Sequence, residues 1–142
     1  MVRNEELKFE GNDILQLYAK ELVEDVKISN VNLREKSLTT SSIRAKWLNY
    51  LFTEQHNLKR AKEYKETILK SKTSNPKNTT SILPMKNEDI IANGDERISK
   101  LNKLIETTKE NINYLENVLN ILNDLGFTIK NAIEAQKLFQ GS

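Results

Sequence analysis

The sequence predicts an all-helical protein, and its composition, its scarcity of turn residues and the spacing of its apolar residues each support that class. The chain has 142 residues, of which 37% are hydrophobic and 30% are charged, with 4 Gly and 2 Pro. This composition is typical of long amphipathic helices and leaves few turn residues for a multi-stranded sheet. A chain of this length supports one well-buried core, so we expect a single domain over residues 1–142.

A short helix is predicted near the N-terminus. Asn12 or Asp13 offers a side-chain oxygen that can cap its first turn. The residues that follow place apolar side chains at intervals of three and four, which is the period of one helix face. These apolar positions are Ile14, Leu15, Leu17, Tyr18, Leu22, Val23 and Val26.

A long second helix is predicted to begin near Ile43 and to end by about Lys72. Four hydroxyl residues, 39–42, offer N-cap oxygens immediately before Ile43. We interpret Trp47, which lies on the apolar face, as a core or interface anchor. The face comprises Ile43, Trp47, Tyr50, Leu51, Leu58, Ala61, Tyr64 and Ile68. Residues 13–72 thus form an N-terminal helical part, and residues 73–93, which show no clean period, form a linker.

The third helix carries the most regular pattern in the chain, within the part that spans residues 94–142. Its apolar positions alternate in steps of three and four, which predicts a coiled-coil seam. The seam runs through Ile98, Leu101, Ile105, Thr108, Ile112, Leu115, Leu119 and Leu122. Leu104, Val118, Ile121 and Leu125 widen it, while the predicted outward positions include Asn111, Asn113, Asn117, Asn120 and Asn123.

A short C-terminal helix is expected after the third. Gly126 can end the third helix in a left-handed conformation, and Thr128 can cap the next one. Ile129, Ala132, Ile133, Gln136 and Phe139 would then share one face.

The wide apolar face of the third helix needs a cover. A helix of roughly 30 residues is about 45 Å long, so we favour coverage by other subunits of a homo-oligomer. The alternative is that the second and third helices fold back on each other within one chain. The predicted oligomer interface comprises Ile98, Leu101, Ile105, Ile112, Leu115, Leu119, Leu122, Phe127, Ile129 and Ile133.

The residues that usually carry catalysis or bind metal are scarce. The chain has no Cys and one His, which excludes disulfides and thiolate metal sites, and we expect His56 to lie on the surface. There is no phosphate-binding loop and no Ser/His/Asp arrangement. We interpret Asp95-Glu96 as support for a helix N-terminus rather than as a metal site. We therefore expect no enzyme, no cofactor and no metal, and, because no apolar run is long enough, no membrane segment.

Charge is distributed unevenly along the chain. Residues 5–25 contain seven acids and two bases, whereas residues 44–77 contain nine bases and three acids. The basic stretch is the candidate polyanion-binding face, although from the residues alone we favour a solvated helix face over DNA binding. Tyr64 lies among these cations, and we favour a core position for it over base stacking. The candidate DNA-binding residues are Lys59, Arg60, Lys62, Lys65, Lys70 and Lys72.

Several stretches resemble the UvsY family of phage recombination mediators. Asp25-Val26-x-Ile28, then Leu33, then the block 45–49 (Ala-Lys-Trp-Leu-Asn), is similar to the family pattern DV-x-I…L…SKWLN with the same spacing. The stretch 126–137, which reads GFTIKNAIEAQK, resembles the closing helix of the family. A third helix with Tyr114-Leu115-Glu116 inside it also looks like the family's third helix, so the similarity runs from about Ile14 to Ser142.

The resemblance implies a ring of six or seven subunits that binds single-stranded DNA. It also implies contacts with a RecA-like recombinase and with the phage single-strand-binding protein, in the cytoplasm of the infected bacterial host. A basic family motif, LKAR followed by two tyrosines and a glycine, falls on 69–72, so Lys70 and Lys72 would be DNA ligands. Here Lys replaces the Arg, and Thr73-Ser74-Asn75-Pro76 replaces the aromatics and glycine, which puts stacking at that place in doubt.

A second function class stays open beside the mediator. A coiled-coil scaffold or virion component would have the same helices, with the basic stretch as incidental solubilising charge. The two differ in one property, because a scaffold forms oligomers that ignore DNA at physiological salt.

Overall fold

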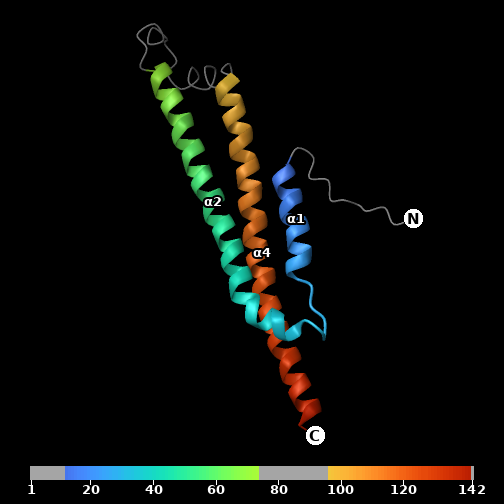
Figure 1. Ribbon diagram of the computed structural model, residues 1–142. Coiled ribbons are helices and arrows are strands. Elements are labelled where there is room, and N and C mark those ends of the chain that lie inside the picture. The colour runs from blue at the N-terminus through green and yellow to red at the C-terminus, as the bar shows by residue number, and fades with distance from the viewer. Residues whose placement is uncertain (1–11, 74–95, 142) are drawn as a thin grey trace, which may run out of the picture. The chain divides into compact units, whose positions relative to one another are not determined.

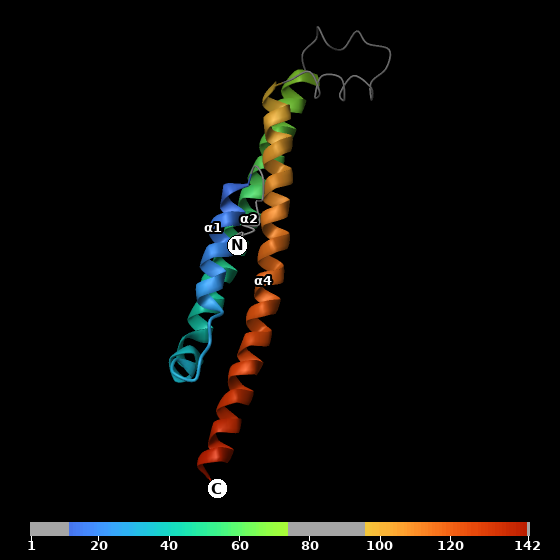
Figure 2. The same ribbon diagram turned by 90° about the vertical axis from the view of Figure 1, so that its right-hand side faces the viewer.

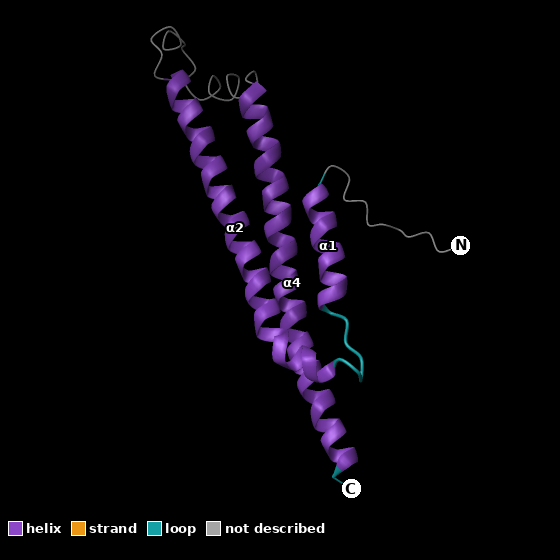
Figure 3. Cartoon of the chain, viewed as in Figure 1, coloured by secondary structure: helices purple, strands orange, loops and turns teal. Residues whose placement is uncertain are grey.

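The computed structural model describes residues 12–73 and 96–141, and within them it contains three helices and no strand (Figure 1, Figure 3). They are α1 (Asp13–Asp25), α2 (Leu33–Thr73) and α4 (Glu96–Gln140). The predicted all-helical class is confirmed. The predicted linker, apart from Thr73, and the side chain of Lys72 lie outside the described residues.

Helix α1 begins where its cap residue predicts. The side chain of Asn12 accepts a hydrogen bond from the backbone N–H of Leu15 (3.2 Å), and Asp13 places an acid in the first turn, where it complements the helix dipole. The buried face is narrower than the apolar pattern predicts. Leu15 is buried, whereas Ile14, Leu17 and Val23 are each about half exposed or more.

Helix α2 begins ten residues before the predicted start. Ser29 and Asn32 cap the preceding turn reciprocally: the Ser29 backbone N–H donates to Asn32 Oδ1 (2.6 Å), and the Asn32 N–H donates to Ser29 Oγ (3.3 Å). The predicted caps have another role, since the hydroxyls of Thr39 and Thr40 donate to the carbonyls of Glu35 and Lys36 one turn earlier. A hydroxyl that bonds back along the helix is compatible with a helix interior.

The described chain divides into two compact units. The first holds α1, the first part of α2 up to Phe52, and α4 from Asn111 onward. Within this unit α1 runs antiparallel to the α2 segment and parallel to the α4 segment (Figure 1, Figure 2). Its buried core comprises Leu33, Trp47, Leu51, Leu115, Val118, Leu122, Leu125 and Ile129. Tyr18, Leu22, Val26 and Tyr50 pack against that core.

The second unit, Thr53–Glu110, is an antiparallel pair of helices made by the end of α2 and the start of α4. Its fully or nearly buried residues come from both helices: Glu54, Ala61, Ile68, Ile98, Ile105 and Thr108. The intrachain fold-back is therefore present here. Tyr64 is 55% exposed, so its predicted core position is wrong. The cause is geometric, because Ala61 and Ile68 already line the buried side and Tyr64 lies beside that line rather than on it.

The predicted break at Gly126 is wrong. Helix α4 continues to Gln140, so there is no separate C-terminal helix, and Thr128 donates its hydroxyl to the Asp124 carbonyl (3.0 Å) instead of capping. A glycine inside a helix costs about 1 kcal/mol relative to alanine. Burial of Leu125 and Ile129 on either side of Gly126 outweighs that cost.

The seam of α4 changes phase near its middle. Ile98, Ile105 and Thr108 are buried, as the seam predicts. The next buried position is Asn111, where the seam predicts Ile112. From there the deepest positions are Asn111, Leu115, Val118, Leu122, Leu125 and Ile129. The predicted outward position of Asn111 is wrong because this part of α4 packs against α1 as well as α2. Asn111 Oδ1 accepts a hydrogen bond from Asn12 Nδ2 (2.8 Å).

Half of the residues predicted for an oligomer interface are buried within the chain itself. Ile98, Ile105, Leu115, Leu122 and Ile129 are each less than 10% exposed. Leu101, Ile112, Leu119 and Ile133 are partly buried, and Phe127 is 68% exposed. Among the described residues, no helix is both long and apolar enough to cross a membrane.

Candidate nucleic-acid interface

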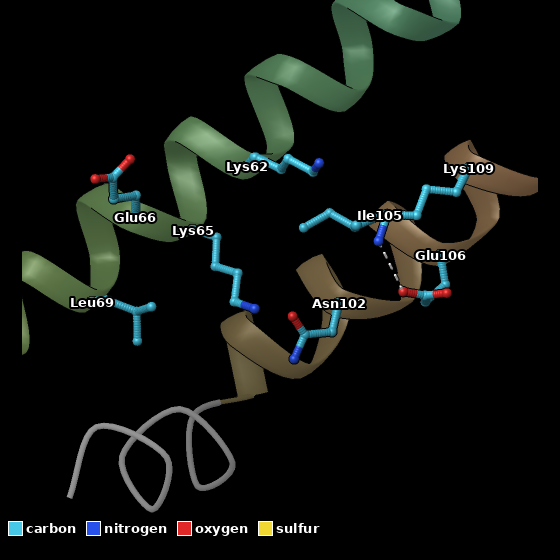
Figure 4. Close-up of a pocket in the computed structure, with 8 residues that line it drawn as sticks. All are labelled: Lys62, Lys65, Glu66, Leu69, Asn102, Ile105, Glu106 and Lys109. Atoms are coloured by element: carbon cyan, nitrogen blue, oxygen red, sulfur yellow. Dashed lines mark ion pairs between the residues drawn. The ribbon is translucent and has the colours of Figure 1, made fainter. Parts of the chain in front are cut away.

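A lysine-lined cleft lies within the second unit, between α2 and α4. Lys62, Lys65, Glu66 and Leu69 line it from α2, and Asn102, Ile105, Glu106 and Lys109 line it from α4 (Figure 4). We call it the Lys62–Lys109 cleft, and its volume is about 320 Å³. Figure 4 shows Lys62 and Lys65 reaching from α2 toward α4, so that cations of two helices point into one space.

The two acids that line the cleft pair with lysines other than Lys62 and Lys65. Glu106 pairs with Lys109 (3.6 Å), and Glu66 pairs with Lys70 one turn along α2 (3.2 Å). Lys62 and Lys65 make no ion pair with any residue that the structure describes. Exposed pairs of this kind contribute about 0–1 kcal/mol, so a phosphate can displace the carboxylate from Lys109 at little cost.

Five of the six predicted DNA-binding residues have described side chains, all but Lys72, and these five do not form one face. Lys62 and Lys65 line the cleft, and Lys59, one turn before Lys62, is exposed on the adjoining side. Arg60 is exposed but lies roughly 160° around α2 from Lys62, since successive residues of a helix differ by about 100°. Lys70 is exposed and paired with Glu66.

Sequence reasoning missed the contribution of α4. Asn102 and Lys109 lie about forty residues from their α2 neighbours, and no local spacing links them. The signal that could have found them was the fold-back alternative, because an antiparallel pairing of the two helices brings the start of α4 beside the end of α2.

The stretch that begins at Asp25 and the block 45–49, both singled out in the sequence, meet in a polar network in the first unit. Asp25 Oδ2 accepts hydrogen bonds from Lys46 Nζ (2.6 Å) and from Trp47 Nε1 (2.8 Å). Glu21 pairs with Lys46 (3.1 Å) and accepts a hydrogen bond from the Tyr50 hydroxyl (3.0 Å). Trp47 is completely buried, which confirms its predicted anchoring position.

This network shifts two pKa values upward. Burial alone would lower the pKa of Lys46, but hydrogen bonds and charge interactions with Asp25 and Glu21 raise it above its ordinary value of 10.5. Burial, and then the hydrogen bond to Glu21, raises the pKa of Tyr50 above its ordinary value of 10.0. Glu21 and Asp25 therefore hold the α1–α2 corner together rather than facing solvent.

Fold and site together define a class of all-helical proteins that present clustered lysines to solvent. In the part of the chain that the structure describes, no group of three or more His, Cys, Asp or Glu side chains could hold a metal ion. His56 is exposed, as predicted.

Comparisons with known proteins specify the family. The sequence profile of the UvsY family, described as "Recombination, repair and ssDNA binding protein UvsY", matches residues 21–142. The chain belongs to this family. A search among curated proteins gave no match.

Solved structures confirm the fold. The chain is similar to the crystal structure of the bacteriophage T4 recombination mediator protein UvsY in lattice type IV, with a TM-score of 0.74 and 19% identity over 89% of this chain and 98% of that one. The lattice type II structure of the same protein gives a TM-score of 0.73 and 18% identity over 90% and 98% of the two chains.

Proposed function

We propose that this protein is a recombination mediator that binds single-stranded DNA and helps to load a RecA-like recombinase onto DNA covered by single-strand-binding protein. Membership of the UvsY family over residues 21–142 carries the proposal. The site of action is the cytoplasm of a phage-infected bacterium, and the two partner proteins are those that the family resemblance implies.

The Lys62–Lys109 cleft supplies a physical basis for sequence-independent DNA binding. Single-stranded DNA is bound without base readout when clustered cations replace the counterions of its phosphates. Lys62 and Lys65 make no ion pair with a described carboxylate, and Lys109 has one weak partner, Glu106. Lys59 and Lys70 are exposed on the adjoining side of α2, within about 80° of Lys62 around the helix, so that a strand leaving the cleft can contact them.

A homo-oligomeric ring would repeat the Lys62–Lys109 cleft once in each subunit. Several identical patches on one assembly raise the overall affinity without any new contact. An exposed apolar stripe on α2, formed by Leu38, Ala45, Leu48 and Phe52, has intervals of seven, three and four residues, which is the spacing of a helix-packing seam. Nothing in the described residues covers this stripe, so we propose it as a contact between copies.

The test is fluorescence anisotropy of a labelled oligothymidylate, titrated with the protein at several salt concentrations. Lys62→Ala/Lys65→Ala is expected to weaken binding and to make the log–log salt slope shallower by roughly 1.4, at about 0.7 per lost phosphate contact. Lys20→Ala/Lys103→Ala removes two exposed cations outside the cleft and serves as the matched control. A folded, assembled wild-type protein that binds no oligonucleotide would overturn the proposal and favour a scaffold.

A further inference from the structure

A second hollow surface lies on the first unit, between the start of α2 and the end of α4. Two adjoining hollows of about 480 Å³ and 410 Å³ share Thr40, Gly126 and Lys130. The first is also lined by Arg44 and Phe127. We call the two hollows together the Arg44–Lys130 groove, and each is large enough to hold a ligand the size of a nucleotide.

The groove is basic and its cations are available. Arg44, Lys130 and Lys137 line it, against one acid, Glu134. None of the three cations forms an ion pair within the described ranges 12–73 and 96–141. An arginine and two lysines along one groove match successive phosphates of a flexible strand.

Hydroxyl donors accompany these cations. Ser41 lines the first hollow and Ser37 the second. Neither hydroxyl is hydrogen-bonded to any described residue, whereas the Thr40 hydroxyl is occupied by the Lys36 carbonyl. Serine hydroxyls on the same helix side as Arg44 can donate to phosphate or sugar oxygens.

Phe127 gives the groove an aromatic wall. Its side chain is 68% exposed although it is fully apolar, and it lines the same hollow as Arg44 and Lys130. An exposed ring beside phosphate-binding cations is the arrangement on which a base of single-stranded DNA stacks, with a preference for no particular base.

Gly126 keeps the floor of the groove open. It lies within α4, where glycine costs about 1 kcal/mol relative to alanine. Its backbone is not left-handed, and a Cβ added there would meet no atom within 4 Å. Packing within the described chain therefore does not require glycine, whereas close approach of a ligand to the helix would favour it.

We infer that the Arg44–Lys130 groove is a second contact for single-stranded DNA, in which Arg44, Lys130 and Lys137 bind phosphates and Phe127 stacks on a base. The inference rests on the proposed function, because it concerns the same ligand. The groove offers base stacking as well as phosphate contacts, whereas the lining of the Lys62–Lys109 cleft has no aromatic side chain.

The first measurement separates phosphate contacts from stacking. Anisotropy titrations use two oligonucleotides of equal length, one of thymidines and one with abasic sites in place of the bases. Arg44→Ala/Lys130→Ala is expected to weaken binding of both and to reduce the salt slope by roughly 1.4. Phe127→Ala is expected to weaken binding of the thymidine strand about fivefold or more and to leave the abasic strand unchanged.

A third variant blocks the groove without removing a cation. Gly126→Gln adds a long neutral side chain where the structure has open space. We expect its helix content and melting temperature to equal or exceed those of the wild type, and its DNA affinity to fall severalfold. Lys20→Ala/Lys103→Ala again serves as the control for loss of charge alone.

Three outcomes would overturn the inference. If Lys62→Ala/Lys65→Ala weakens binding and the groove variants do not, the groove is not a DNA contact and the proposed function stands. If the wild type binds neither oligonucleotide, the proposed function fails and the inference with it. If Phe127→Ala lowers the assembly mass measured by light scattering, the groove is a contact between copies instead.

Discussion

Asp25 accepts hydrogen bonds from Lys46 and Trp47 through the same carboxylate oxygen, Oδ2. The two motifs that resemble the family pattern therefore meet at one atom, across the turn between α1 and α2. Trp47 is completely buried, so its indole N–H depends on this acceptor. A buried donor that loses its acceptor costs about 1–3 kcal/mol.

The first prediction concerns that bond. Asp25→Ala should lower the free energy of unfolding by about 1–3 kcal/mol, because Trp47 Nε1 is then left without an acceptor. Urea denaturation followed by helix circular dichroism measures the change. Glu24→Ala removes an exposed acid whose one ion pair within the described residues is with Lys27, and it should change stability by less than about 0.5 kcal/mol. Equal effects for both variants would show that the shared acceptor has no special importance.

Alkaline stability is the second prediction. The folded protein holds the protons of Lys46 and Tyr50 more tightly than the unfolded chain does, since both pKa values are raised on folding. This stabilisation is fully present below their ordinary pKa values and is lost as the pH rises through the raised ones. The melting temperature should therefore fall above about pH 10, and less steeply in Lys46→Met/Tyr50→Phe. Lys20→Met is the control, and a double variant that retains the wild-type pH dependence would contradict the linkage.

Asn111 gives a local prediction. Its side chain is 1% exposed and accepts from Asn12, the N-cap residue of α1. Asn111→Leu removes this acceptor at a cost of about 1–3 kcal/mol, and the loss should appear first at α1. Hydrogen exchange read by mass spectrometry should show faster exchange of peptides over residues 12–25. Asn113→Leu, at an exposed position two residues away, should leave α1 exchange at the wild-type rate.

Asn111 also shows what a sequence pattern can and cannot specify. Three helical elements, the Asn12 cap and the buried Trp47 follow from local spacing and composition, and the structure confirms them. The phase change of the α4 seam does not follow, because it depends on α1 packing against α4, and a single helix cannot report how many neighbours it has. The same limit explains why Lys109 was missed in the cleft. Arg60 is a different case, because helix periodicity alone already separates it from Lys62 by about 160°, and its grouping with the lysines overlooked that spacing.

Gly126 shows a second kind of error, because a glycine that locally predicts a helix end lies inside α4, where packing of the residues on either side keeps the chain helical. The fourth prediction is that Gly126→Ala raises the free energy of unfolding by about 0.8–1 kcal/mol, since alanine is the better helix former and its Cβ meets no atom within 4 Å. Thermal denaturation measures the gain. Gly141→Ala is the matched control at the helix end, where a Cβ would lie 3.1 Å from the Lys137 carbonyl oxygen, and no gain is expected.

The last prediction concerns the exposed stripe on α2. Leu38 is 76% exposed and Phe52 is 55% exposed, which leaves two large apolar side chains in water at helix-packing spacing. Leu38→Lys/Phe52→Lys should leave helix content unchanged, because neither side chain belongs to the buried core. It should lower the mass measured by light scattering, since burying lysine charges between copies is costly. DNA affinity should fall with the mass, because fewer linked patches give less avidity. Val31→Lys, which alters a single 95% exposed residue outside the stripe, should keep the wild-type mass, and an unchanged mass in the double variant would place the contact between copies elsewhere.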